Sequence, residues 1–191
     1  MTRWTADDHE RLADDRSVLD HLRELRPELH GDRALRGYTG LPFVADDGGR
    51  AAAGFRGSAG DCVTRALAIA TGAGYRLVYD QLAAGMAAAP PRRRGARAGQ
   101  RRPRSARAGV LSSVYRPWLA ERGWLWTPTM GIGTGTTVHL RPGELPDVPR
   151  LIARCSRHLV AVIDGVAFDT ADPCRGGTRA VYGYWTEGPA R

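Results

Sequence analysis

The clearest pattern of hydrophobic and polar positions lies in residues 156–170, where two apolar runs flank Asp164 and Gly165. An Asp-Gly pair between two such runs favours a type I′ turn, because both central residues of that turn need a positive φ. We therefore predict a β-hairpin in which Ile163 faces Val166. This register decides which side chains of the two strands can meet.

The rest of the chain divides into helical patterns followed by strand patterns. Apolar positions recur at helical spacing in three early segments, 5–29, 62–71 and 75–84. A fourth helix is expected to end at Gly123. Alternating or continuous apolar runs predict strands at 124–126, 136–140, 150–155 and 180–185. Helices followed by strands predict an α+β fold, with N-terminal helices packed on an antiparallel sheet.

Three regions follow from the same pattern. Residues 1–36 are expected to be a helical extension, and residues 37–187 to be the α+β domain. Within the domain, residues 87–109 break the pattern, because Pro, Arg, Gly and Ala occur there without any periodicity. We expect a flexible, arginine-rich insert at this place.

Charge and cysteine content narrow the class of protein. The net charge of +8 is local, because residues 92–107 contain eight arginines and no acidic residue. Three cysteines at unrelated spacings fit neither a disulfide framework nor a zinc site. No apolar run approaches membrane-spanning length. We therefore expect a cytoplasmic protein with no metal, no cofactor and no membrane contact.

Cys62 is the candidate nucleophile. It lies at the predicted start of an Ala-rich helix, with Ser58 or Gly60 expected as the N-cap. The positive end of the helix dipole lowers the pKa of a thiol and favours the reactive thiolate. Asp61 beside it opposes thiolate formation, so an imidazolium partner is required. The alternative interpretation of Cys62 is a small, buried apolar residue.

His158 is the candidate partner of this thiol. The hairpin register places Asp169 on the same face as His158, as its diagonal neighbour, within reach of an imidazole–carboxylate contact. A nucleophile, a base and an orienting acid make a Cys-His-Asp triad. Asp172 is the alternative acid, because a bulge in the second strand would exchange its orientation with that of Asp169.

These residues resemble the papain-like cysteine peptidase fold. The sequence Gly60-Asp61-Cys62 heads an early helix, and 150–165 has an apolar strand, a short turn, His158 and a second apolar strand. The layout is similar to that of bacteriocin-processing peptidases and of uncharacterised phage and actinobacterial proteins. The resemblance covers about 55–185 and implies cleavage or transfer at an amide bond of a peptide or protein substrate.

One position departs from the papain pattern. That pattern implies a glutamine six residues before the nucleophile as an oxyanion-hole donor, and this chain has Arg56 there. Arg56 itself or the Ser58 hydroxyl is the candidate replacement, acting together with the backbone N–H of Cys62.

Three classes of function therefore compete. The first is a cysteine-dependent hydrolase or acyl transferase. The second is an accessory protein that binds nucleic acid non-specifically through phosphate contacts. The arginines that would make those contacts are Arg92, Arg93, Arg94, Arg97, Arg101, Arg102, Arg104 and Arg107. The third is a catalytically inactive papain-like binding module.

Overall fold

The computed structural model describes residues 39–89 and 105–189. The predicted extension over 1–36 and most of the predicted insert lie outside the described residues. The described part is a mixed α+β structure with three α-helices and one six-stranded sheet.

The sheet is mixed rather than antiparallel throughout. Its spatial order is β1-β5-β4-β3-β6-β2. The bounds are β1 Phe43–Ala45, β2 Trp124–Pro128, β3 Arg150–Cys155, β4 His158–Ile163, β5 Val166–Asp169 and β6 Val181–Glu187. Every pair is antiparallel except β1 with β5, which is parallel. The antiparallel prediction is wrong for β1, because the whole helical region separates it from β5 and provides the long crossover that a parallel pair needs.

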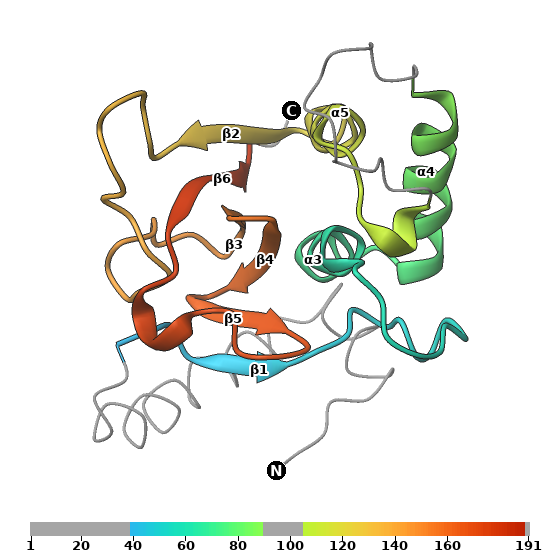
Figure 1. The fold of residues 1–191 in the computed structure, drawn as a ribbon, viewed down its shortest axis with the longest axis horizontal. Helices are drawn as coiled ribbons and strands as arrows, with labels where there is room; N and C mark the ends of the chain where they lie inside the picture. Colours follow the sequence, from blue (N-terminus) through green and yellow to red (C-terminus); the bar gives the residue numbers. More distant parts are fainter. Residues whose placement is uncertain (1–38, 90–104, 190–191) are drawn as a thin grey trace, which may run out of the picture.

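Three helices gather on one side of this sheet (Figure 1). They are α3 Cys62–Thr71, α4 Tyr75–Ala88 and α5 Ser112–Ala120. Helix α3 is buried from Val63 to Ala70, because it lies between the sheet and the other helices. It ends at Gly72, whose φ of 69° is the left-handed conformation that favours glycine.

Strand alternation divides the apolar side chains between two cores. On the helical side, Leu159, Ala161 and Ile163 of β4 face α3 and belong to the core that also includes residues of α5. On the opposite side, Val160 and Val162 pack against other strand residues and against apolar residues of the 129–149 connection. Both faces of β4 are therefore buried, which holds its first residue, His158, in a fixed position.

The predicted Asp-Gly hairpin is confirmed. Asp164 and Gly165 have φ values of 47° and 72°, and Ile163 pairs with Val166. A second two-residue turn, at Ser156-Arg157, joins β3 to β4 where a short turn was expected before His158. Two tight turns in succession leave the β3–β4–β5 meander with no freedom of register.

Several predicted boundaries differ from the structure. Helix α4 continues to Ala88, and a 3₁₀ turn, η1, forms at Ala106–Ala108, so both ends of the predicted insert carry regular structure. The strand predicted at 136–140 is wrong. Only one bridge forms there, between His139 and Ala180, and the segment bonds to the β5–β6 connection instead. None of the described helices is long and apolar enough to cross a bilayer.

Gly183 of β6 is predicted to be essential for packing. Its φ is 151°, and an added Cβ would lie 2.2 Å from the Trp126 ring. Gly183→Ala should therefore lower the free energy of unfolding by about 1–3 kcal/mol in urea denaturation, the usual cost of overpacking. A Gly183→Ala/Trp126→Leu double variant should recover part of this loss. No recovery would show that the cause is backbone strain or the Thr127 carbonyl, which lies 2.7 Å from the added Cβ, and not the ring.

Candidate active site

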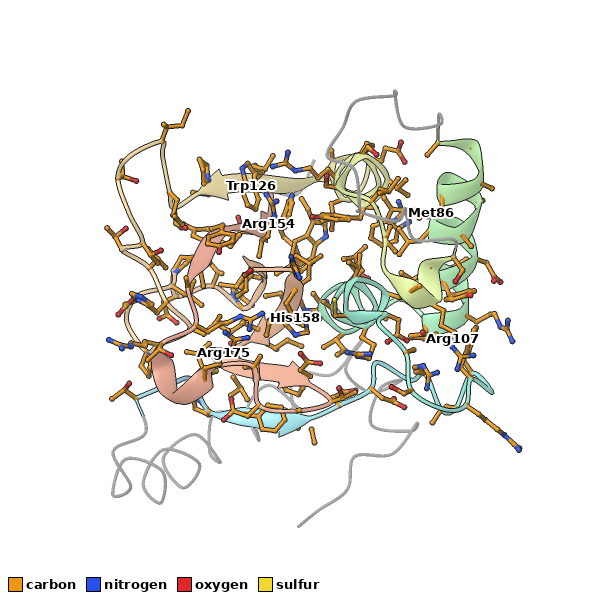
Figure 2. The ribbon with its side chains drawn as sticks, viewed as in Figure 1. Met86, Arg107, Trp126, Arg154, His158 and Arg175 are labelled. Carbon is orange, nitrogen blue, oxygen red and sulfur yellow. The ribbon has the colours of Figure 1, made fainter. Side chains whose placement is uncertain are left out.

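The candidate residues lie at the ends of three elements. Cys62 is the first residue of α3, His158 is the first residue of β4, and Asp169 is the last residue of β5. Because β4 and β5 are antiparallel neighbours, the start of one and the end of the other share an edge of the sheet. Figure 2 shows His158 between α3 and the strands.

The predicted contact between the ring and the acid is present. His158 Nε2 is hydrogen-bonded to Asp169 Oδ2. Asp169 is 5% exposed, and its other oxygen accepts the Thr170 N–H at 2.7 Å and the Arg65 guanidinium at 3.2 Å. These contacts fix the carboxylate, which in turn fixes the ring.

Asp172, the alternative acid, does not lie beside His158 in the way that Asp169 does. Asp172 is exposed in the turn after β5, and its Oδ1 accepts the Cys174 N–H at 2.9 Å. The β4–β5 register is regular through Val166, Ala167 and Phe168, so no bulge exchanges Asp172 with Asp169. Asp169 is therefore the carboxylate that orients the His158 ring.

The second ring nitrogen of His158 faces the Cys62 thiol. Since Nε2 is engaged by Asp169, Nδ1 is left for the hydrogen bond between His158 and Cys62. Burial lowers the pKa of His158, but the hydrogen bonds with Asp169 and Cys62 outweigh it and raise the pKa to about 9. The imidazole is therefore protonated at neutral pH.

The pKa of the Cys62 thiol is shifted in the opposite direction. Burial raises the pKa of Cys62, whereas the hydrogen bond and charge of His158 and the backbone of Leu159 lower it, and the net result is below the usual value. A lowered thiol pKa beside a raised imidazole pKa favours a thiolate–imidazolium pair. Such a pair is the state in which a cysteine is most reactive as a nucleophile.

A buried arginine joins the helix to the acid. Arg65 lies one turn after Cys62 on α3 and is 8% exposed. Its guanidinium bonds to Asp61 Oδ1 and, at 3.2 Å, to Asp169 Oδ1. Arg65 therefore ties the element that carries the nucleophile to the strand that carries the acid.

Asp61 has more partners on its other oxygen. Asp61 is fully buried, and its Oδ2 lies 2.9 Å from Arg50 Nε and accepts the Tyr75 hydroxyl. Burial and the carboxylate raise the pKa of Tyr75, which keeps this donor protonated. The N-cap residue of α3 is Asp61, so the expected N-cap at Ser58 or Gly60 is wrong. The Asp61 side chain makes no capping hydrogen bond to the helix. Two arginines offset its charge, which removes the expected opposition to the thiolate.

Sequence reasoning missed this network. The signal was a single charged residue, Arg65, inside an otherwise apolar and Ala-rich helix, since a buried charge requires a partner. Nothing in the spacing of Asp61 and Asp169 shows that both reach the same guanidinium, because that contact depends on tertiary packing.

The candidate oxyanion donors both lie in the exposed loop before α3. Arg56 and Ser58 are exposed, and their backbone carbonyls accept Arg107 Nη2 at 2.8 and 3.3 Å. Arg107 thus fastens the end of the predicted insert to this loop, and its carbonyl also accepts the Gly60 N–H at 2.9 Å. The other seven arginines proposed for nucleic-acid contact lie outside the described residues.

Tyr115 of α5 is a further group near the thiol that sequence reasoning missed. It is 6% exposed and packs edge-on against Trp185. Burial raises the pKa of Tyr115, Arg154 and Arg116 lower it, and the charge of Cys62 raises it again. The hydroxyl therefore stays protonated and can donate a hydrogen bond on the α5 side of the site.

The remaining cysteines differ from Cys62 in environment. Cys155 and Cys174 are 2% and 0% exposed. Burial raises the pKa of Cys155 to about 11, although Arg179 lowers it in part. Within 39–89 and 105–189, no group of three or more His, Cys, Asp or Glu side chains could hold a metal ion.

Arg65→Met should destabilise the protein. The variant leaves Asp169 without its guanidinium and Asp61 with Arg50 and Tyr75 only on Oδ2, and removal of one partner from a buried ion pair typically costs about 3–5 kcal/mol. Urea denaturation should show this loss. An Arg65→Met/Asp61→Asn double variant should lose less than the sum of the two single changes. Strict additivity would contradict the proposed coupling.

The pKa of His158 should depend on Asp169. In the wild type, NMR titration of the ring protons should give a pKa of about 9. Asp169→Asn retains an acceptor but removes the charge, so the pKa should fall by about one unit or more. Asp172→Asn is the matched control and should leave the titration unchanged. An unshifted midpoint in Asp169→Asn would show that Asp169 does not hold the proton on the ring.

Comparison of the chain with known proteins identifies no relative from which the role of this site could be inferred. No family model, no curated protein and no solved structure matches it. The arrangement of Cys62, His158 and Asp169 is therefore the basis on which a function is inferred.

Proposed function

We propose that this protein is a cysteine-dependent hydrolase or acyl transferase of papain-like layout that acts on an amide bond of a peptide or protein. One observation carries the proposal. A thiol with a lowered pKa, at the head of a buried helix, lies against a histidine whose other ring nitrogen is bonded to a buried carboxylate.

The reaction follows from these roles. The Cys62 thiolate attacks the carbonyl carbon, a C–S bond forms, and the electron pair moves to the carbonyl oxygen. As the tetrahedral intermediate collapses, the C–N bond breaks and His158 gives its proton to the leaving nitrogen. His158 then takes a proton from water, and the resulting hydroxide attacks the thioester carbonyl. A C–O bond forms, the C–S bond breaks, and the electron pair returns to the Cys62 sulfur, so that a carboxylic acid and the resting thiolate–imidazolium pair remain. An amine in place of that water gives acyl transfer.

The oxyanion requires donors that are aimed before the reaction begins. The first is the backbone N–H of Cys62, because the first N–H groups of a helix have no intrahelical acceptor. For the second, the candidates are Ser58, Arg56 and the Tyr115 hydroxyl, whose pKa is raised in part by the charge of Cys62. Arg65 acts through Asp169 and is a positioning residue.

The rival functions have less support. Arg107, the one arginine of the nucleic-acid set among the described residues, uses its guanidinium on the carbonyls of Arg56 and Ser58. An inactive binding module would have no need of a thiol with a lowered pKa. Reactivity of the thiol distinguishes the enzyme from that module.

Cys62 should react with iodoacetamide well below the pH at which an ordinary thiol ionises. At pH 6–7 its alkylation, followed by mass spectrometry, should exceed that of Cys155 and Cys174. His158→Ala should slow the reaction about tenfold or more, because the thiolate population falls. His139→Ala is the matched control, since His139 bonds to Glu144 elsewhere. Equal alkylation rates in the wild type and in His158→Ala would contradict the proposed enzyme and favour the inactive binding module.

Turnover completes this test. A mixture of internally quenched peptides should be cleaved by the wild type, and Cys62→Ala should lose about 10³-fold or more of that activity. Cleavage that survives in Cys62→Ala would refute the assignment of the nucleophile.

A further inference from the structure

A pocket of about 210 Å³ opens beside the His158–Asp169 pair. Its remaining walls are Arg65, the turn over residues 170–173, Arg175 and Arg179. Cys62 is not part of its lining. The pocket is therefore adjacent to the catalytic ring but separate from the nucleophile.

Three arginines, Arg65, Arg175 and Arg179, line the pocket together with two carboxylates, Asp169 and Asp172. Arg175 is exposed and forms no ion pair within 39–89 and 105–189. Arg179 donates from Nη2 to the Ser156 carbonyl at 2.9 Å and lies near the Cys155 thiol. Arg65, on the inner wall, is already bonded to Asp61 and Asp169. Arg175 and Arg179 are thus available to an anion.

The position of the pocket indicates which half of a substrate would enter it. Figure 2 shows Arg175 beside His158, on the side of the ring away from α3, whose first residue is Cys62. The acyl half of a substrate becomes bonded to Cys62, and the leaving nitrogen receives its proton from His158. A group that lies beyond the ring therefore belongs to the leaving half.

Size and charge restrict that group. Pockets for drug-sized ligands span roughly 300–1,000 Å³, so about 210 Å³ suits a group of the size of one amino-acid residue. Asp172 on the same wall opposes a doubly charged phosphate but tolerates a single carboxylate beside two arginines.

We propose that this pocket, with Arg175 and Arg179, is a leaving-group subsite for an amine that carries one carboxylate. Its place in the reaction rests on the proposed function, whereas its binding chemistry does not. The carboxylate comes either from a free C-terminus or from an acidic side chain next to the scissile bond. The two sources differ only in where the acid is attached.

Binding to the full-length Cys62→Ala protein tests the subsite without any turnover. Three probes are titrated by NMR at neutral pH and low salt: alanine, which has an α-carboxylate; glutamate α-amide, which has a side-chain carboxylate; and alanine amide, which has none. At least one acid should bind saturably and more tightly than alanine amide, and salt should weaken it. Whichever acid binds identifies the source of the carboxylate.

Matched variants locate the binding. Arg175→Gln should weaken the bound acid about fivefold, since a partly exposed ion pair contributes up to about 1 kcal/mol. Arg76→Gln is the control, because Arg76 is an exposed arginine of α4 that lies over Phe55. Equal binding of all three probes, or no effect of Arg175→Gln, overturns the subsite. The proposed function fails on a different measurement, namely equal alkylation rates of Cys62 in the wild type and in His158→Ala. The two failures are therefore distinguishable.

Discussion

The buried ion pairs of Arg65 determine the geometry of the site. A guanidinium that is removed from water requires carboxylate partners, and here the partners come from opposite directions, Asp61 before α3 and Asp169 at the end of β5. The same contacts that satisfy the arginine hold the acid against His158. The contacts that join α3 to the sheet at this point are therefore also the contacts that position the acid.

This network also explains how a cysteine next to an aspartate can be activated. The charge of Asp61 is directed towards Arg50, Arg65 and Tyr75, and the thiol responds to His158 and Leu159 instead. Asp61 and Cys62 thus have different hydrogen-bond partners, although the charge of Arg65 acts on both. The helix makes this separation, because it turns the side chains at its first positions in different directions.

Local rules were sufficient for part of this arrangement. The Asp164-Gly165 turn has a steric cause within two residues, so the hairpin register and the His158–Asp169 contact could be predicted from sequence. The parallel β1–β5 pair, the role of Arg65 and the proximity of Tyr115 could not, since each depends on segments that meet only after packing. The conformation of a turn depends on the residues within it. The partners of a buried charge and the pairing of distant strands depend instead on the packing of the whole fold.

The meander that carries His158 and Asp169 places both side chains at strand ends, while the apolar residues between them fill the two cores. The β5–β6 connection, which supplies Arg175 and Arg179, follows directly. One residue of this connection, Cys174, is fully buried in the core that contains Val160 and Val162 of β4, whereas Arg175 is exposed. The charge at position 175 can therefore change at little cost in core packing, but a larger residue at position 174 would disturb the strand that carries His158.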